Sequence, residues 1–281
     1  MIYIGLAGWG DHDDLYTTGL QGQSKLEIYA GHFPIVELDA SFYAIQPLRN
    51  MEKWGRETPP TFRFIVKAFQ GMTGHQKGFA PFESKEEMFE AFRLSLEPLE
   101  RLNKLAMVLC QFPPWFDCKK EHVQWVRYVK EQLKEKPVAL EFRHRSWFEG
   151  EMRGKTLQFM REEGWIHSIC DEPQAGMRSI PIVAEATNDL TLIRFHGRNV
   201  HGWNDPGDGT WRDVRYLYRY NNEELQDWQE RLQTLTTQTK DIFVIFNNNS
   251  GGDAAANAKQ LIDLLEIEYQ GLAPRQLDLF S

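Results

Sequence analysis

Four carboxylates lie at or just after the ends of apolar runs, and such side chains can transfer protons or bind a metal. They are Glu37, Asp39, Glu141 and Asp171. If these run ends meet in space, the carboxylates could act as general acid and base or hold a hard divalent cation. His196 follows another run and would add a nitrogen ligand to that set. The pattern therefore indicates acid–base or metal-assisted chemistry.

Cations at the ends of the same runs provide an alternative to a metal. Lys67, Arg143, Arg194 and Arg198 equal the carboxylates in number, so ion pairs alone could neutralise the acids. A divalent metal is then the less favoured interpretation, and the cofactor stays unknown. Lys67 could form a Schiff base, as lysines at barrel strand ends sometimes do, or could serve only as an ion-pair partner.

A segment with two glycines after the last apolar run favours an anion site. The residues of that site are Asn247, Asn248, Gly251 and Gly252, joined by Arg143, Arg194 and Arg198 from other run ends. Glycine lets a backbone approach a ligand closely, and the helix expected next would offer unpaired N–H groups. Guanidinium groups match phosphate and carboxylate. We therefore expect a pocket for a phosphate-containing or carboxylated ligand. The alternative is a structural turn, with the arginines in ion pairs to Glu141 or Asp171.

Aromatic residues also follow the apolar runs and could stack on a flat ligand. Trp9, Tyr43 and Trp147 are the candidates. The alternative for each is that it packs a loop onto the body of the protein.

Eight apolar runs must position these side chains. They cover residues 2–7, 35–38, 62–66, 105–109, 138–140, 165–169, 190–193 and 242–246. Nearly every run ends in a polar or charged residue, and helix-length segments separate most of them. This order is typical of an α/β fold, the (β/α)8 TIM-type barrel, whose functional site lies at the carboxyl ends of the strands. Residues 172–189 lack a helical pattern and are a candidate degenerate β/α unit.

Length and composition limit the alternatives. A chain of 281 residues that is 42% hydrophobic suits one barrel domain over residues 1–270. The net charge of −8 excludes a uniformly basic nucleic-acid-binding surface but not a local basic pocket. Three cysteines without paired spacing argue against disulfides and suit a reducing compartment. We find no signal-peptide pattern and no apolar run long enough to cross a bilayer, so we expect a cytoplasmic protein.

The motifs at the run ends resemble those of the DUF72 family, also called YecE-like proteins. They are GLAGW (5–9), VELDASFY (36–43), Trp54, TPPTFRF (58–64), VKA (66–68), QFPP (111–114), EFRHRSW (141–147), RFHGR (194–198), FNN (246–248) and GG (251–252). The resemblance covers essentially the whole chain and implies a TIM-type barrel, but it implies no activity. Ala7 stands where the family often has Ser, and Asp39 where it often has Asn, so no detailed role is carried over to either position.

The tail, residues 271–281, ends in a second motif. Gln276, Leu277, Asp278, Leu279 and Phe280 are similar to the pentapeptide by which bacterial polymerases and repair proteins dock on the sliding clamp. The last two would fill an apolar pocket, and the glutamine would fix the orientation by hydrogen bonds. The alternative is that the tail packs on the base of the barrel.

Three functions are consistent with this sequence. The first is a phosphodiester hydrolase recruited to DNA by the tail. The second is a hydrolase or isomerase-type enzyme that acts on a phosphorylated or carboxylated metabolite. The third is a clamp-associated binding protein without catalysis.

Overall fold

The computed structural model describes residues 1–16, 22–203 and 214–275, and within them eight parallel strands close into a barrel. The strands are β1 (Ile2–Ala7), β2 (Ile35–Leu38), β3 (Arg63–Lys67), β4 (Leu105–Gln111), β5 (Val138–Glu141), β6 (Ile166–Asp171), β7 (Leu190–Phe195) and β8 (Asp241–Phe246). Pairing of β8 with β1 completes the ring. The predicted (β/α)8 barrel is confirmed. Several strands extend past their apolar runs, because polar residues such as Lys67 and Glu141 still belong to the strand ladder.

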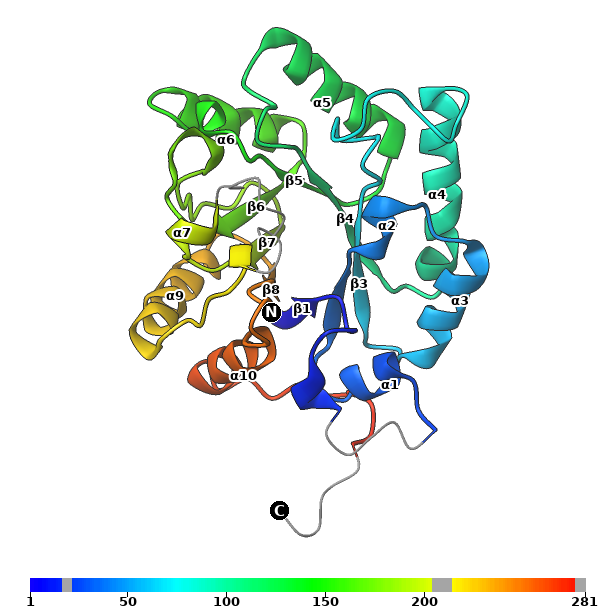
Figure 1. The fold of residues 1–281 in the computed structure, drawn as a ribbon, viewed down its shortest axis with the longest axis vertical. Coiled ribbons are helices and arrows are strands. Elements are labelled where there is room, and N and C mark those ends of the chain that lie inside the picture. The colour runs from blue at the N-terminus through cyan, green and yellow to red at the C-terminus, as the bar shows by residue number, and fades with distance from the viewer. Residues whose placement is uncertain (17–21, 204–213, 276–281) are drawn as a thin grey trace.

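Helices lie around the outside of the strands (Figure 1). They are α1 (Lys25–Tyr29), α2 (Ala40–Tyr43), α3 (Leu48–Glu57), α4 (Lys85–Arg101), α5 (Lys120–Leu133), α6 (Met152–Glu162), α7 (Val200–Trp203), α9 (Asn222–Leu235) and α10 (Ala254–Leu264). Between β6 and β7 there is only a single 3-10 turn, η3 (Gly176–Arg178). The expected degenerate unit at residues 172–189 is therefore present. None of the helices in the described ranges is both long and apolar enough to span a bilayer.

Two-residue alternation along each strand decides which side chains enter the barrel. An apolar cluster separate from the larger core contains Ile35, Ile65, Leu109, Ala139, Ile166, Leu192 and Ile245. The residues two positions later face the same way, and they are Glu37, Lys67, Gln111, Glu141, Ser168, Arg194 and Asn247. The interior is therefore apolar along most of its length and polar at the carboxyl ends of the strands.

The described part of the tail lies at the opposite end of the barrel. The hydroxyl of Thr61, just before β3, donates to the carbonyl of Gly271 at 2.7 Å. The amide of Ala273 donates to the carbonyl of Ala30, which precedes β2, at 3.0 Å. The clamp-binding motif, residues 276–280, lies outside the described residues, so its docking on a sliding clamp stays a prediction from the sequence.

Candidate active site

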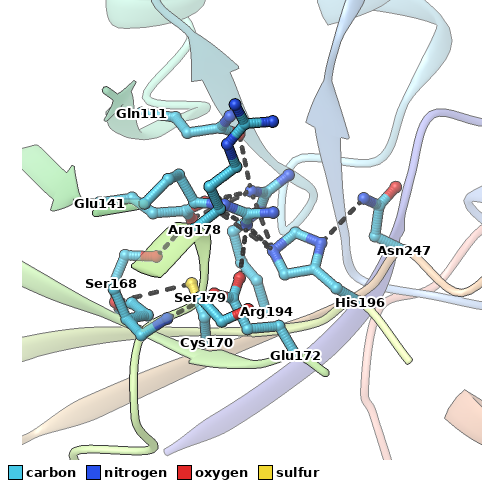
Figure 2. A network of polar contacts seen from close by, with 12 residues as sticks. Gln111, Glu141, Ser168, Cys170, Glu172, Arg178, Ser179, Arg194, His196 and Asn247 are labelled. Carbon is cyan, nitrogen blue, oxygen red and sulfur yellow. Dashed lines mark hydrogen bonds and ion pairs between the residues drawn. The ribbon is translucent and has the colours of Figure 1, made fainter. Parts of the chain in front are cut away.

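Arg194 belongs to a network of polar contacts at the carboxyl ends of the strands (Figure 2), and it lies between two buried carboxylates, Glu37 and Glu141. Its Nη2 and Nε contact the two oxygens of Glu37 at 2.5 and 2.8 Å. Its Nη1 lies 3.0 Å from both oxygens of Glu141 and 3.2 Å from Oε1 of Gln111. A guanidinium with these partners has little capacity left for a ligand. The ion-pair alternative, and not the anion-binding one, describes Arg194.

Arg143 joins the same network from the loop after β5. Its Nη1 lies 3.0 Å from Glu141, 3.0 Å from Oε2 of Glu172 and 2.9 Å from Nε2 of His196. The guanidinium also lies over the ring of Trp203, 5.0 Å from its centroid. Burial alone would raise the pKa of Glu141, but Arg194 and Arg143 outweigh burial and lower that pKa to about 2. Glu141 is therefore an anchoring anion and a poor proton acceptor.

Because Glu141 is held as an anion, the free energy of unfolding should depend on pH in the acid range. Because the pKa of Glu141 is lowered in the folded chain to about 2, its stabilising contribution is complete above the unfolded value near 4.5 and is lost as the pH falls toward 2. We expect the free energy of unfolding to drop by an amount on the order of 3 kcal/mol from this group over that window. Urea unfolding of the wild type and of Glu141→Gln at several pH values measures it. A variant with the same acid dependence as the wild type would contradict the assignment.

His196 and His75 are neutral imidazoles beside cations. Burial, followed by the charges of Arg143 and Arg194, lowers the pKa of His196 well below its usual range. Burial, followed by Lys67 and Arg143, lowers the pKa of His75 to about 4. In His196, Nε2 lies 2.9 Å from the guanidinium of Arg143, and Nδ1 lies 3.1 Å from the side-chain amide of Asn247.

Lys67 and Asp39 form an ion pair that reaches solvent. Nζ lies 3.0 Å from Oδ1 of Asp39, and the two side chains are 14% and 35% exposed. Burial lowers the pKa of Lys67, but the charges of Asp39 and Glu37 together with Tyr216 outweigh it, and the net shift is upward. A protonated amine is not a nucleophile, so the ion-pair role fits Lys67 and the Schiff-base role does not.

Glu172 is a functional candidate that the sequence analysis missed. Its Oε1 accepts from the amide of Ile180 at 2.7 Å, while Oε2 lies near Arg143 without hydrogen-bond geometry. Burial raises the pKa of Glu172 to about 7, and Arg143 opposes the rise. A carboxyl that titrates near neutrality suits proton transfer. Counting in steps of two from buried Ile166 would have indicated Glu172.

The same alternation separates Asp171 from the other carboxylates. Asp171 faces outward and accepts from the indole N–H of Trp228 in α9 at 2.5 Å. Arg198 contacts Asp171 at 2.7 Å and Glu224 at 3.0 Å. The expectation that Asp171 converges with Glu37, and that Arg198 binds an anion beside Arg194, is therefore not met. These two form a structural pair between the barrel and α9.

The segment after β8 is mainly a structural turn. Asn248 is buried, and its amide donates to the carbonyl of Tyr218 and to Asn257, both at 2.9 Å. At Gly251 a Cβ would come within 2.7 Å of Leu217, and Gly252 has a φ of +81°. Of the four residues predicted there for an anion site, Asn247 alone contacts the polar network, through His196. The turn alternative therefore holds for the other three.

The three predicted stacking residues have different environments. Trp147 is buried, lies parallel to Phe142 with ring centroids 3.7 Å apart, and donates to the carbonyl of Phe116. Trp9 is half-buried and meets the edge of Trp54. Tyr43 is 66% exposed. Trp147 therefore belongs to the core, and Tyr43 is the one of the three whose ring is mostly open to solvent.

A metal does not fit the group that could hold one. Glu141, Cys170 and His196 offer ligand atoms within 4.8 Å of one another. However, guanidinium nitrogens of Arg143 and Arg194 lie 2.9 and 3.4 Å from Nε2 of His196, where they would repel a cation. Burial also raises the pKa of Cys170 well above its usual value, so it stays a thiol.

Six side chains at or beyond the carboxyl ends of the strands define the mouth of the barrel, a name kept below for Asp39, Lys67, His75, Arg143, Glu172 and His196. Asp39 and Lys67 reach solvent, whereas Arg143, Glu172 and His196 are buried. Beneath them lies the buried ion-pair network of Glu37, Glu141 and Arg194. His75 lies on the loop after β3. Sequence spacing could not predict that His75 lies near Lys67 and Arg143, because the path of the long loop that carries it follows no periodic pattern.

Comparisons with known proteins give a consistent family. The family described as "Protein of unknown function DUF72" matches residues 3–278. The UPF0759 protein YunF of Bacillus subtilis is 65% identical over 282 residues, which cover 100% of both chains. The UPF0759 protein YecE of Escherichia coli K12 is 26% identical and covers 70% of this chain and 74% of its own.

Two solved structures have the same architecture. A DUF72 family protein from Enterococcus faecalis V583 superposes with a TM-score of 0.92 at 39% identity, covering 99% of this chain and 100% of its own. A DUF72 family protein from Thermotoga maritima MSB8 gives a TM-score of 0.79 at 31% identity, covering 95% and 100%.

Proposed function

The chain belongs to the DUF72 family, whose description names no reaction, and we therefore propose a function from the residues of the mouth. The protein is an enzyme that binds a small anionic substrate at Lys67, close to the buried Arg143 and His196, and moves a proton with Glu172. The observation that carries this proposal is that two imidazoles, His75 and His196, lie among cations at the mouth.

The same positive charges lower the pKa of both imidazoles. Burial is the largest cause that lowers the pKa of His75 and of His196, and the charges of Lys67 and Arg143 lower both pKa values further. Cations gathered at one end of the barrel in a chain of net charge −8 favour a small anion and not an extended polyanion. Lys67, whose side chain is 14% exposed, is a cation of the mouth that a substrate can reach from solvent.

The arrangement suits proton transfer next to a developing negative charge. Fixed cations in a buried setting stabilise such a charge strongly, because they need no reorganisation when it forms. Glu172, whose pKa burial raises to about 7, can release a proton and take it back near neutral pH. This step is common to the hydrolase and isomerase alternatives, and which of them applies depends on the substrate.

Replacing Lys67 with methionine is expected to weaken anion binding at the mouth at least about tenfold, because a direct charge contact is lost. The measurement is calorimetric titration with inorganic phosphate, then with sugar phosphates and a short phosphodiester. The fold should persist, since Asp39, left without its partner, is 35% exposed and stays hydrated.

Lys53→Met is the matched control, because Lys53 is 66% exposed on α3 and pairs there with Glu57. This variant should bind as the wild type does. Wild-type protein that binds none of these anions would overturn the proposal. Binding without turnover of any ligand would favour the non-catalytic alternative, whereas cleavage of the phosphodiester would favour the nuclease alternative.

A further inference from the structure

We propose that the anionic ligand carries a planar ring, as a nucleoside monophosphate does, and that this ring stacks on Trp115 at the rim of the mouth. This inference rests on the proposed anion site and adds the substrate class. Trp115 lies on the loop after β4, and no role in the network described above involves it.

A continuous row of rings connects Lys67 to Trp115. The Nζ of Lys67 lies 5.0 Å from the centroid of Phe42. Phe42 meets His75 edge to face at 4.9 Å, and His75 meets Trp115 in the same way at 5.9 Å. The rings come from α2, which follows β2, and from the loops after β3 and β4, so the tertiary structure assembles the row.

The outer end of this row is open to solvent. Trp115 is 63% exposed, and Tyr43, which meets the edge of Phe42 at 5.2 Å, is 66% exposed. The amide of Phe116 donates to the carbonyl of Pro113 at 2.9 Å, which closes a turn around Trp115. An indole held by a turn but exposed to water loses little entropy when a flat ring stacks on it, and every nucleobase offers such a face.

The net charge of the chain favours a mononucleotide over a nucleic-acid strand, although both carry a ring and a phosphate. A nucleic-acid strand would bring many phosphates toward a chain of net charge −8, whereas a mononucleotide brings one phosphate to Lys67. The ring and the cation lie at opposite ends of the row, so the ligand needs a spacer between its ring and its anion. In a nucleotide, the ribose separates the ring from the phosphate.

The experiment compares AMP with ribose 5-phosphate by calorimetric titration of the full chain at fixed ionic strength. We expect AMP to bind about tenfold more tightly or better, the range that stacking of one base provides. Trp115→Ala should remove this advantage and leave the affinity for ribose 5-phosphate unchanged. Trp115→Phe should retain most of the advantage, because a phenyl ring still stacks.

The controls separate the two proposals. Leu94→Ala, on α4 and 45% exposed, should change neither affinity, whereas Lys67→Met should weaken both. Equal binding of AMP and ribose 5-phosphate, with no effect of Trp115→Ala, would overturn the stacking inference and leave the anion site standing. Binding of neither ligand, nor of inorganic phosphate, would overturn both.

Discussion

Replacing Arg194 with methionine is expected to destabilise the folded chain by about 3–5 kcal/mol. Arg194 neutralises Glu37 and Glu141, and all three side chains are at most 1% exposed. Methionine fills part of the space but leaves two buried carboxylates facing each other with less compensating charge. Urea denaturation, followed by circular dichroism, measures the change. The effect should appear in stability, because Arg194 is buried and its guanidinium contacts mainly the two carboxylates.

Arg127→Met provides the comparison, since it also removes an arginine–glutamate pair. The Nε of Arg127 lies 2.6 Å from Glu163, but its side chain is 60% exposed, so the loss should be less than about 1 kcal/mol. A double variant that combines Arg194→Met with Glu37→Gln should recover part of the lost stability, because it removes one of the stranded charges. If Arg194→Met lost no more stability than Arg127→Met, the buried network would not anchor the barrel.

Replacing Trp147 with alanine is expected to cost about 3–5 kcal/mol of stability. Trp147 is 2% exposed, stacks on Phe142 at 3.7 Å and lies nearly parallel to Phe116. Its removal leaves a cavity under the loops after β4 and β5, and the carbonyl of Phe116 loses the indole donor. The measurement is again urea denaturation. The result would show that Trp147 supports the loops of the mouth from beneath and does not stack on a ligand.

Trp115→Ala is the matched control, because the same side chain is removed at a position that is 63% exposed. Its loss of stability should stay within about 0.5 kcal/mol, as for most surface substitutions. A large destabilisation by Trp115→Ala would mean that Trp115 is a packing residue. It would then count against the stacking proposal as well.

The strand positions, the barrel and the end of the barrel that carries the polar residues all followed from local pattern. Apolar runs separated mostly by helix-length segments allow few arrangements other than a parallel barrel. Residues at the carboxyl ends of those runs must therefore meet at one end. Glu37, Lys67, Glu141, Arg194 and His196 were placed correctly at that end for this reason.

Contacts between distant segments decided the environment of each of these residues. They determined which charge is neutralised, which side chain faces outward and which one stays accessible to solvent. Arg194 pairs with Glu37 across 157 positions of the chain, and Arg198 with Asp171 across 27. Asp171 and Glu172 are neighbours in sequence, yet one faces α9 and the other faces the mouth. His75 and Trp115 reach the mouth on loops whose path no periodicity records. The sequence by itself thus determined the chemical groups and the end of the barrel where they gather. The tertiary structure decided their partners and their accessibility, because pairing and burial arise only when separate strands and loops come into contact.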